Sequence, residues 1–199
     1  MKIENNVGEI LVLNTKQDYP LFSQYCYLLE SGLRKKALII LASFLQTTTQ
    51  WKYIDRQMFC NMFFQSSITN NDLTVFLTTP LSEQLIKPTL LAMTVAEPQN
   101  YLAFKWLGEY FNELTYLKKA NELNPNNPLI VELLVIKIEW ELWLSTHHLP
   151  EGYLGNYEED ITNINLALLL VDSFENKNEF YNQFINYKQK IELYIKTQK

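Results

Sequence analysis

Apolar residues recur at intervals of three and four along almost the whole chain, which is the spacing of amphipathic α-helices. Only five glycines occur in 199 residues, so the chain lacks the glycine-rich turns typical of all-β folds. We therefore expect an all-α protein. Its helices would form antiparallel pairs, stacked in a partly repeat-like manner, or an irregular helical bundle. The only strand-like segment is "EILVL" at residues 9–13, and so short a strand is marginal by itself.

Prolines, glycines and polar clusters divide this pattern into separate helices. The expected helical segments are residues 18–32, 33–48, 50–67, 80–98, 99–124, 128–146, 157–173 and 177–197. Asp18 is a plausible cap of the first helix, and Gly32 ends it. Asn112 marks a possible break within 99–124, and the prolines at 125 and 128 form a hard stop.

Two of these segments have apolar residues on more than one face. In 50–67, one stripe comprises Trp51, Ile54, Met58 and Met62, and a second beside it comprises Tyr53, Phe59 and Phe63. The segment 128–146 is apolar on most sides, so we expect it to be central and substantially buried. Trp140 and Trp143 share a face of it, and a core position for both is favoured over ligand stacking.

Length and composition favour one globular domain covering residues 1–199, in which 1–17 is an N-terminal extension with the short strand. Hydrophobic residues make up 47% and charged residues 20%, which excludes a disordered chain. Glu4 and Glu9 interrupt the first apolar run, so we expect no signal peptide. Uncharged windows stop short of about 18 apolar residues, so we expect no membrane span and a soluble cytoplasmic protein.

Cys26 and Cys60 are the only cysteines, and each lies in an apolar, helix-like run. Two buried free thiols are favoured over a single disulfide, because a disulfide needs an oxidising compartment that the N-terminus does not indicate.

The net charge of −5 is unevenly distributed along the chain. Residues 129–174 contain eight acidic residues and one basic residue, whereas residues 1–60 carry +2 and residues 175–199 carry +2. An acidic segment of this kind opposes binding to nucleic-acid phosphates, and it can attract a basic protein surface.

Within this segment, six residues are the candidate partner-binding set: Glu139, Glu141, Trp143, Glu158, Glu159 and Asp160. The last three acids also fall in the first turn of an expected helix, where carboxylates favour the helix dipole without any further role. A solvated face or helix-start charge therefore competes with a binding face, and paired catalytic carboxylates are the least favoured reading.

No recognisable catalytic or metal-binding motif accompanies these residues, so we expect neither an enzyme nor a cofactor or metal site. His147 and His148 are the only histidines, and adjacent residues on a helix diverge by about 100°. The chain contains no Cys-x-x-Cys, His-Glu-x-x-His, Gly-x-Ser-x-Gly or glycine-rich phosphate loop.

Three segments resemble tetratricopeptide repeats. "FKWLGEYF" places Phe104, Leu107, Gly108 and Phe111 in a pattern similar to the W-x2-L-G-x2-Y signature, and "ANELNP" supplies the following alanine and proline. "GNYEEDITNINLALLLVD" and "SGLRKKALIILASF" are similar to repeat helices, and the three segments cover about half of the chain. The resemblance implies stacked helix pairs that present a concave surface to a peptide or protein, and proteins of this family seldom do chemistry.

These observations favour a non-catalytic protein–protein interaction module with an acidic face at 129–174 for a basic partner. A specific form is an immunity or antitoxin-like protein that blocks a bacterial toxin. The alternative is a small-molecule-binding or regulatory helical domain, with a pocket in the aromatic-rich interior around Trp51, Phe59 and Phe63.

Overall fold

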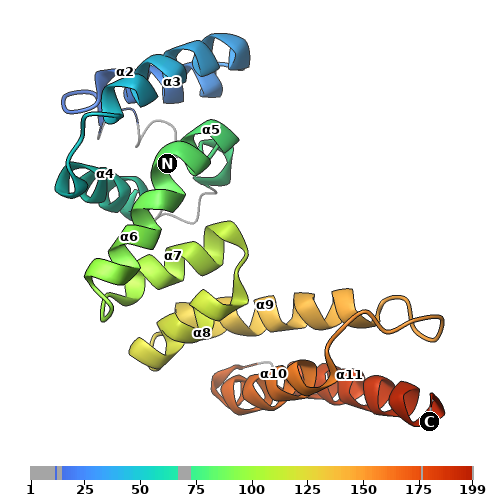
Figure 1. Ribbon diagram of the computed structural model, residues 1–199. Helices are drawn as coiled ribbons and strands as arrows, with labels where there is room; N and C mark the ends of the chain where they lie inside the picture. The colour runs from blue at the N-terminus through green and yellow to red at the C-terminus, as the bar shows by residue number, and fades with distance from the viewer. Residues whose placement is uncertain (1–11, 13–14, 67–72, 176, 199) are drawn as a thin grey trace, which may run out of the picture. The chain divides into compact units, whose positions relative to one another are not determined.

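The computed structural model describes residue 12 and residues 15–66, 73–175 and 177–198. Helices and their connecting turns account for these residues, with no strand among them, so the predicted all-α fold is confirmed (Figure 1). The helices form two compact units, Met1–Phe111 (unit 1) and Asn112–Lys199 (unit 2). The single domain over 1–199 stays a prediction, and the possible strand at 9–13 lies almost wholly outside the described residues.

Unit 1 contains α2 (Pro20–Glu30), α3 (Arg34–Thr48), α4 (Tyr53–Gln65), α5 (Thr79–Leu81), α6 (Lys87–Ala96) and α7 (Tyr101–Phe111). A 3-10 turn at Leu73–Val75 precedes α5, and a π-helical turn at Ser82–Ile86 joins α5 to α6. Helix α2 packs against α3, and α6 packs against both α4 and α7. The expected helices of this region are therefore present, with boundaries that differ by a few residues.

Backbone geometry explains three of the boundaries. Gly32 ends α2 with φ +72°, and the amide of Leu33 donates to the carbonyl of Leu28 at 2.9 Å, as in a Schellman motif. Asn112 also has a positive φ, +60°, and it separates α7 from α8 at the predicted break. The predicted cap at Asp18 is wrong, because α2 begins after Tyr19, with Pro20 in its first turn and no capping side chain.

The core of unit 1 is built from aromatic rings. Phe59 of α4 contacts Phe22 of α2 and Phe44 of α3, with ring centroids 4.9 and 5.2 Å apart. Phe59 and Phe63 are fully buried, whereas Ile54 and Met58 are 52% and 58% exposed. Of the two stripes in this helix, the second therefore has its two phenylalanines in the core, while its Tyr53 is 38% exposed. Larger rings fill the space between helices better and remove more apolar area from water.

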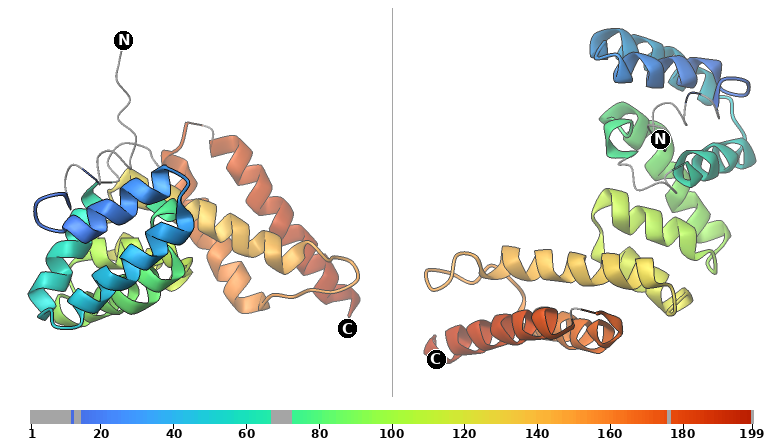
Figure 2. Two further views of the ribbon diagram at one scale, coloured as in Figure 1. Left: turned by 90° about the horizontal axis from the view of Figure 1, so that it is seen from above. Right: turned by 180° about the vertical axis from the view of Figure 1, so that it is seen from behind.

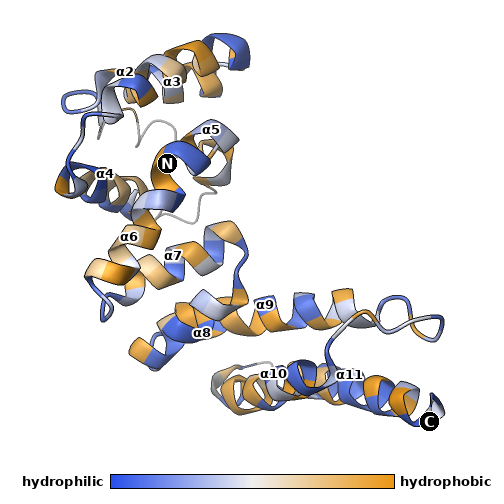
Figure 3. Cartoon of the chain, viewed as in Figure 1, coloured by the Kyte–Doolittle hydropathy of each residue, from blue (hydrophilic) through white to orange (hydrophobic). Residues whose placement is uncertain are grey.

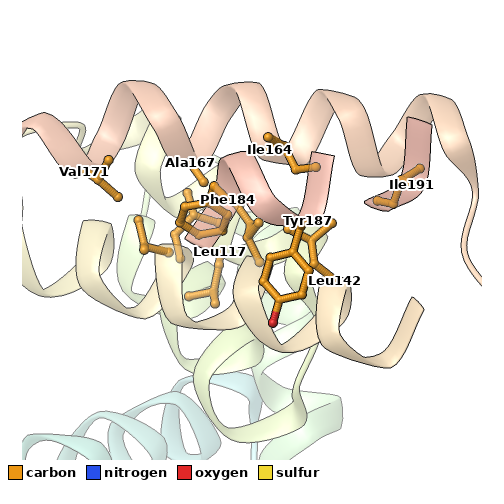
Figure 4. Close-up of a cluster of buried hydrophobic side chains, with 11 residues drawn as sticks. Leu117, Leu142, Ile164, Ala167, Val171, Phe184, Tyr187 and Ile191 are labelled. Atoms are coloured by element: carbon orange, nitrogen blue, oxygen red, sulfur yellow. The ribbon is translucent and has the colours of Figure 1, made fainter. Parts of the chain in front are cut away.

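Unit 2 contains α8 (Leu114–Leu123), α9 (Pro128–Thr146), α10 (Tyr157–Leu170), the 3-10 turn Val171–Ser173 and α11 (Lys177–Thr197). Helix α9 packs against α8, α10 and α11, and α10 packs against α11. Helices α9 and α11 run in the same direction, with α10 antiparallel to both (Figures 1 and 2). Leu142 of α9, Ile164 of α10 and Phe184 of α11 meet in the core of this unit (Figure 4).

The corner at residues 124–128 joins two helices that pack against each other. Helix α8 ends at Leu123, before the predicted stop, and packs against α9 across it. Asn127 caps α9, since its side-chain oxygen accepts hydrogen bonds from the amides of Leu129 at 3.1 Å and Ile130 at 3.4 Å. Pro128 occupies the first turn, where its missing amide hydrogen costs nothing.

In the ranges that the structure describes, no helix is both long enough and apolar enough to cross a membrane.

Candidate functional site

One face of α9 is apolar and exposed to solvent. Its members are Ile136, Trp140, Trp143 and Leu144, with 49%, 49%, 44% and 37% of their surface exposed. We call these four residues the aromatic face of α9. The opposite side of the helix is buried against α8, α10 and α11. Nine of the 19 residues of α9 are buried, so the expectation of a central and substantially buried helix is confirmed. The expected core position of both tryptophans is wrong.

Apolar residues recur along the whole length of α9, and its neighbours in unit 2 cover only one side of it (Figure 3). A helix with apolar residues on every side can therefore leave an apolar face in water. Large exposed apolar patches of this kind commonly mark interaction sites.

The aromatic side chains of α9 form an ordered stack that continues past its end. Trp140 and Trp143 are stacked with ring centroids 5.0 Å apart and an interplanar angle of 19°. Trp143 stacks in turn on His147, at 4.6 Å and 15°. Nδ1 of His147 lies 2.8 Å from the carbonyl oxygen of Leu144 and donates to it, which fixes the orientation of the imidazole.

A groove lies beside this stack, between the C-terminal end of α9, the following loop and α11. Its volume is about 840 Å³. Trp143, His147 and Pro150 line one side, and Tyr187, Lys190 and Tyr194 of α11 line the other. Lys190 is the only lysine, arginine or acid among the described residues that line this groove.

Two of the predicted acids on α9 are engaged within the chain. Glu139 accepts a hydrogen bond from the side-chain amide of Gln183 on α11. Glu141 forms an ion pair of 2.5 Å with Lys137, whose side chain is buried. Removing Glu141 would leave a buried cation without its partner, so this acid stabilises the fold.

The remaining predicted acids lie at the start of α10 and divide into two kinds. Glu158 and Glu159 are exposed in the first turn, where the side chain of Asn156 accepts from the amide of Glu159 at 3.1 Å. Asp160 is only 5% exposed. Its carboxylate accepts a hydrogen bond of 2.6 Å from the hydroxyl of Tyr153.

Asp160 belongs to a closely packed polar cluster that connects the loop after α9 to the start of α10. A Cβ added to Gly155 would lie 2.3 Å from Oδ2 of Asp160 and 2.6 Å from Oγ of Ser145. Burial raises the pKa of Asp160, and hydrogen bonds with Tyr153 and Ser145 oppose the rise. Asp160 is therefore enclosed within unit 2, and we do not carry it forward as a partner-binding residue.

The six predicted residues thus do not form one acidic face. Trp143 lies on the aromatic face and at the edge of the groove, Glu139 and Glu141 have partners within the unit, and Glu158 and Glu159 begin another helix. Sequence reasoning missed Tyr187, Lys190 and Tyr194. Their spacing of three and four residues on α11 was visible in the sequence, but nothing there indicated that α11 runs alongside α9.

The aromatic interior of unit 1 is a packed core. Phe59 and Phe63 are fully buried, and the ring of Trp51 contacts Phe59 at 5.8 Å. The expected ligand pocket around these rings is therefore filled by the rings themselves.

The two thiols are free and buried, as predicted. Burial raises the pKa of Cys60 to about 12, and it also raises the pKa of Cys26. The thiolate, which is the nucleophilic form, is thus disfavoured at both positions. Within the described ranges, no group of three or more histidines, cysteines and acids is arranged to hold a metal ion.

Neither a family model, nor a curated protein, nor a solved structure matches this chain.

Proposed function

We propose that this protein is a non-catalytic protein–protein interaction module that binds a basic partner through the aromatic face of α9. The observation that carries the proposal is the exposure of two stacked tryptophans, 49% and 44%, on a face whose four members are all apolar. Tryptophan is enriched among the interface residues that contribute most to binding energy. The stack also holds both rings in place before binding, which lowers the entropy lost on association.

The charge of unit 2 supports a basic partner. Unit 2 holds thirteen acidic and eight basic residues, so it carries the whole net charge of −5. Glu132, Glu158 and Glu159 are exposed and form no ion pair within the described part of the chain. Charge of one sign accelerates the encounter with an oppositely charged protein, while buried apolar contacts slow dissociation.

We also propose a tetratricopeptide-like stacking of helix pairs, which the packing of α8 on α9 and of α10 on α11 supports. A more specific form of the proposed function is an immunity or antitoxin-like role, in which unit 2 covers the working surface of a basic toxin. This role is supported by the negative charge of unit 2 together with the aromatic face of α9.

Quantitative affinity capture from cells of the native organism, followed by kinetics with the purified captured protein, tests the proposal. We expect Trp140→Ala combined with Trp143→Ala to weaken binding by about 2 kcal/mol or more, mainly through faster dissociation. Glu158→Lys combined with Glu159→Lys should slow association and reduce its salt dependence.

The matched control is Tyr27→Ala combined with Tyr181→Ala, which removes two exposed aromatic rings carried by α2 and α11. This variant should bind like the wild-type protein. Equal binding by the tryptophan variant and the tyrosine control would refute the aromatic face as the partner surface.

A further inference from the structure

The groove between α9 and α11 has the size and lining of a small-molecule site. Its volume, about 840 Å³, lies within the range of roughly 300–1,000 Å³ that is usual for such sites. Rings and aliphatic side chains form most of its wall, with amides and hydroxyls from Gln183, Asn186 and Thr197. A mostly apolar wall with a few polar groups is the usual composition of a ligand pocket.

The electrostatics of the groove favour a negatively charged ligand. Lys190 is exposed, and no carboxylate of the described residues lies within ion-pair distance of its ammonium. One turn away on α11 lie Asn186, Tyr187, Leu193 and Tyr194, none of them acidic. Glu139 of α9 accepts a hydrogen bond from Gln183, which lines the groove. A cation without an acidic partner is therefore available on a unit that is otherwise negative.

The stacked rings of α9 also favour a negatively charged ligand, and they favour one with an aromatic ring. Trp143 stacks both on Trp140, three residues before it on the helix, and on His147, four residues after it. The exposed part of Trp143 is therefore mainly its rim, where the ring carries partial positive charge and the indole N–H is a donor. An aromatic ligand can meet such a rim edge to face, which is a favoured geometry for ring pairs.

We propose that this groove binds a small organic acid with an aromatic body. Lys190 pairs with its carboxylate, and the aromatic body packs between the rim of Trp143 on one side and Tyr194 on the other. The site shares only Trp143 with the aromatic face of α9. Lys190 and Tyr194 lie outside that face, so this inference and the proposed function can fail separately.

Binding of two matched probes to the full-length chain tests the inference. The probes are 2-naphthoate and 2-naphthamide, which differ in charge but hardly in shape, and isothermal titration or ligand-observed NMR measures their affinities. We expect the wild-type protein to bind naphthoate about fivefold more tightly than naphthamide, as for an ion pair partly exposed to water. Lys190→Met should abolish this preference for naphthoate. Tyr194→Ala should weaken the binding of both probes.

Lys196→Met is the control, because Lys196 is exposed on the same helix and does not line the groove. It should leave the preference for naphthoate intact. Circular dichroism melting curves of all variants verify that each is folded. Equal affinity of the wild-type protein for both probes, or an equal loss in Lys190→Met and Lys196→Met, would overturn the proposal. Absence of naphthoate binding at millimolar concentration would overturn it as well.

Discussion

The two units of this protein use aromatic residues in opposite ways. Each unit contains two of the four tryptophans. In unit 1, Trp106 is almost completely buried and stacks on Phe64 at 4.7 Å, while Trp51 joins the ring cluster around Phe59. In unit 2, Trp140 and Trp143 stack on each other at the surface. The same residue type stabilises the fold in one unit and is free to contact a partner in the other.

The two units also differ in net charge. Unit 1 holds nine acidic and nine basic residues, whereas all of the net charge of −5 belongs to unit 2. An exposed apolar face promotes self-association, and like charge on every copy opposes it. The proposed partner surface therefore lies on the unit that carries the net negative charge.

The largest expected loss of stability follows from removing a buried ring of unit 1. Phe59→Ala should lower the free energy of unfolding by about 3–5 kcal/mol, because it removes a fully buried ring that contacts Phe22, Phe44 and Trp51. Chemical denaturation followed by circular dichroism measures it. A loss below about 1 kcal/mol would mean that these rings do not form a tightly packed core.

The next largest loss of stability should follow from a substitution in the loop beside the groove of unit 2. Gly155→Ala should destabilise the protein by about 1–3 kcal/mol, because the new methyl group would overlap Asp160 and Ser145. Gly152→Ala is the matched control, since a Cβ there meets no atom within 4 Å. Similar denaturation midpoints for the two variants would contradict the close packing of this cluster.

A pH-dependent effect should follow from the buried carboxylate in the same cluster. Burial raises the pKa of Asp160 above its usual 3.8, so the folded state binds this proton more tightly than the unfolded state does. The wild-type protein should therefore gain stability relative to Asp160→Asn as the pH falls from 7 towards 4. Denaturation of both proteins across this range measures the difference. A difference that stays constant, or that changes in the opposite direction, would contradict the raised pKa.

The smallest expected effect on stability belongs to the aromatic face of α9. Trp140→Ala should cost no more than about 1.5 kcal/mol, the value of one stacked aromatic pair at a surface. Trp106→Ala removes the same side chain from a buried position and should cost about 3–5 kcal/mol. Thermal and chemical unfolding of the two variants compares them directly. Equal losses would show that the face of α9 is covered in the free protein.

Much of the secondary structure could be predicted because its causes are local. Gly32 and Asn112 adopt positive φ values at the predicted breaks, and Asn127 and Pro128 begin α9 at the predicted corner. The choice of buried face could not be predicted where two apolar stripes competed. In α4, only the neighbouring helices decide that Phe59 is buried and Met58 is exposed.

The candidate site was predicted only in part for the same reason. Trp143 was identified from its place in the acidic segment, but Lys190 and Tyr194 lie more than forty residues away in sequence. Asp160 looked like a surface acid at a helix start, and the hydroxyl of Tyr153 shows that its carboxylate is turned inward.

The sequence by itself determined the helices, several of their ends, the two buried thiols and the concentration of negative charge towards the C-terminal half. These follow from backbone conformational preference, apolar periodicity and composition, which act over a few residues. The tertiary structure alone decided which apolar residues of α9 remain in water, which acids have partners, and where the groove lies. Those properties depend on which helices pack together, and contacts between distant segments are not encoded in any local pattern.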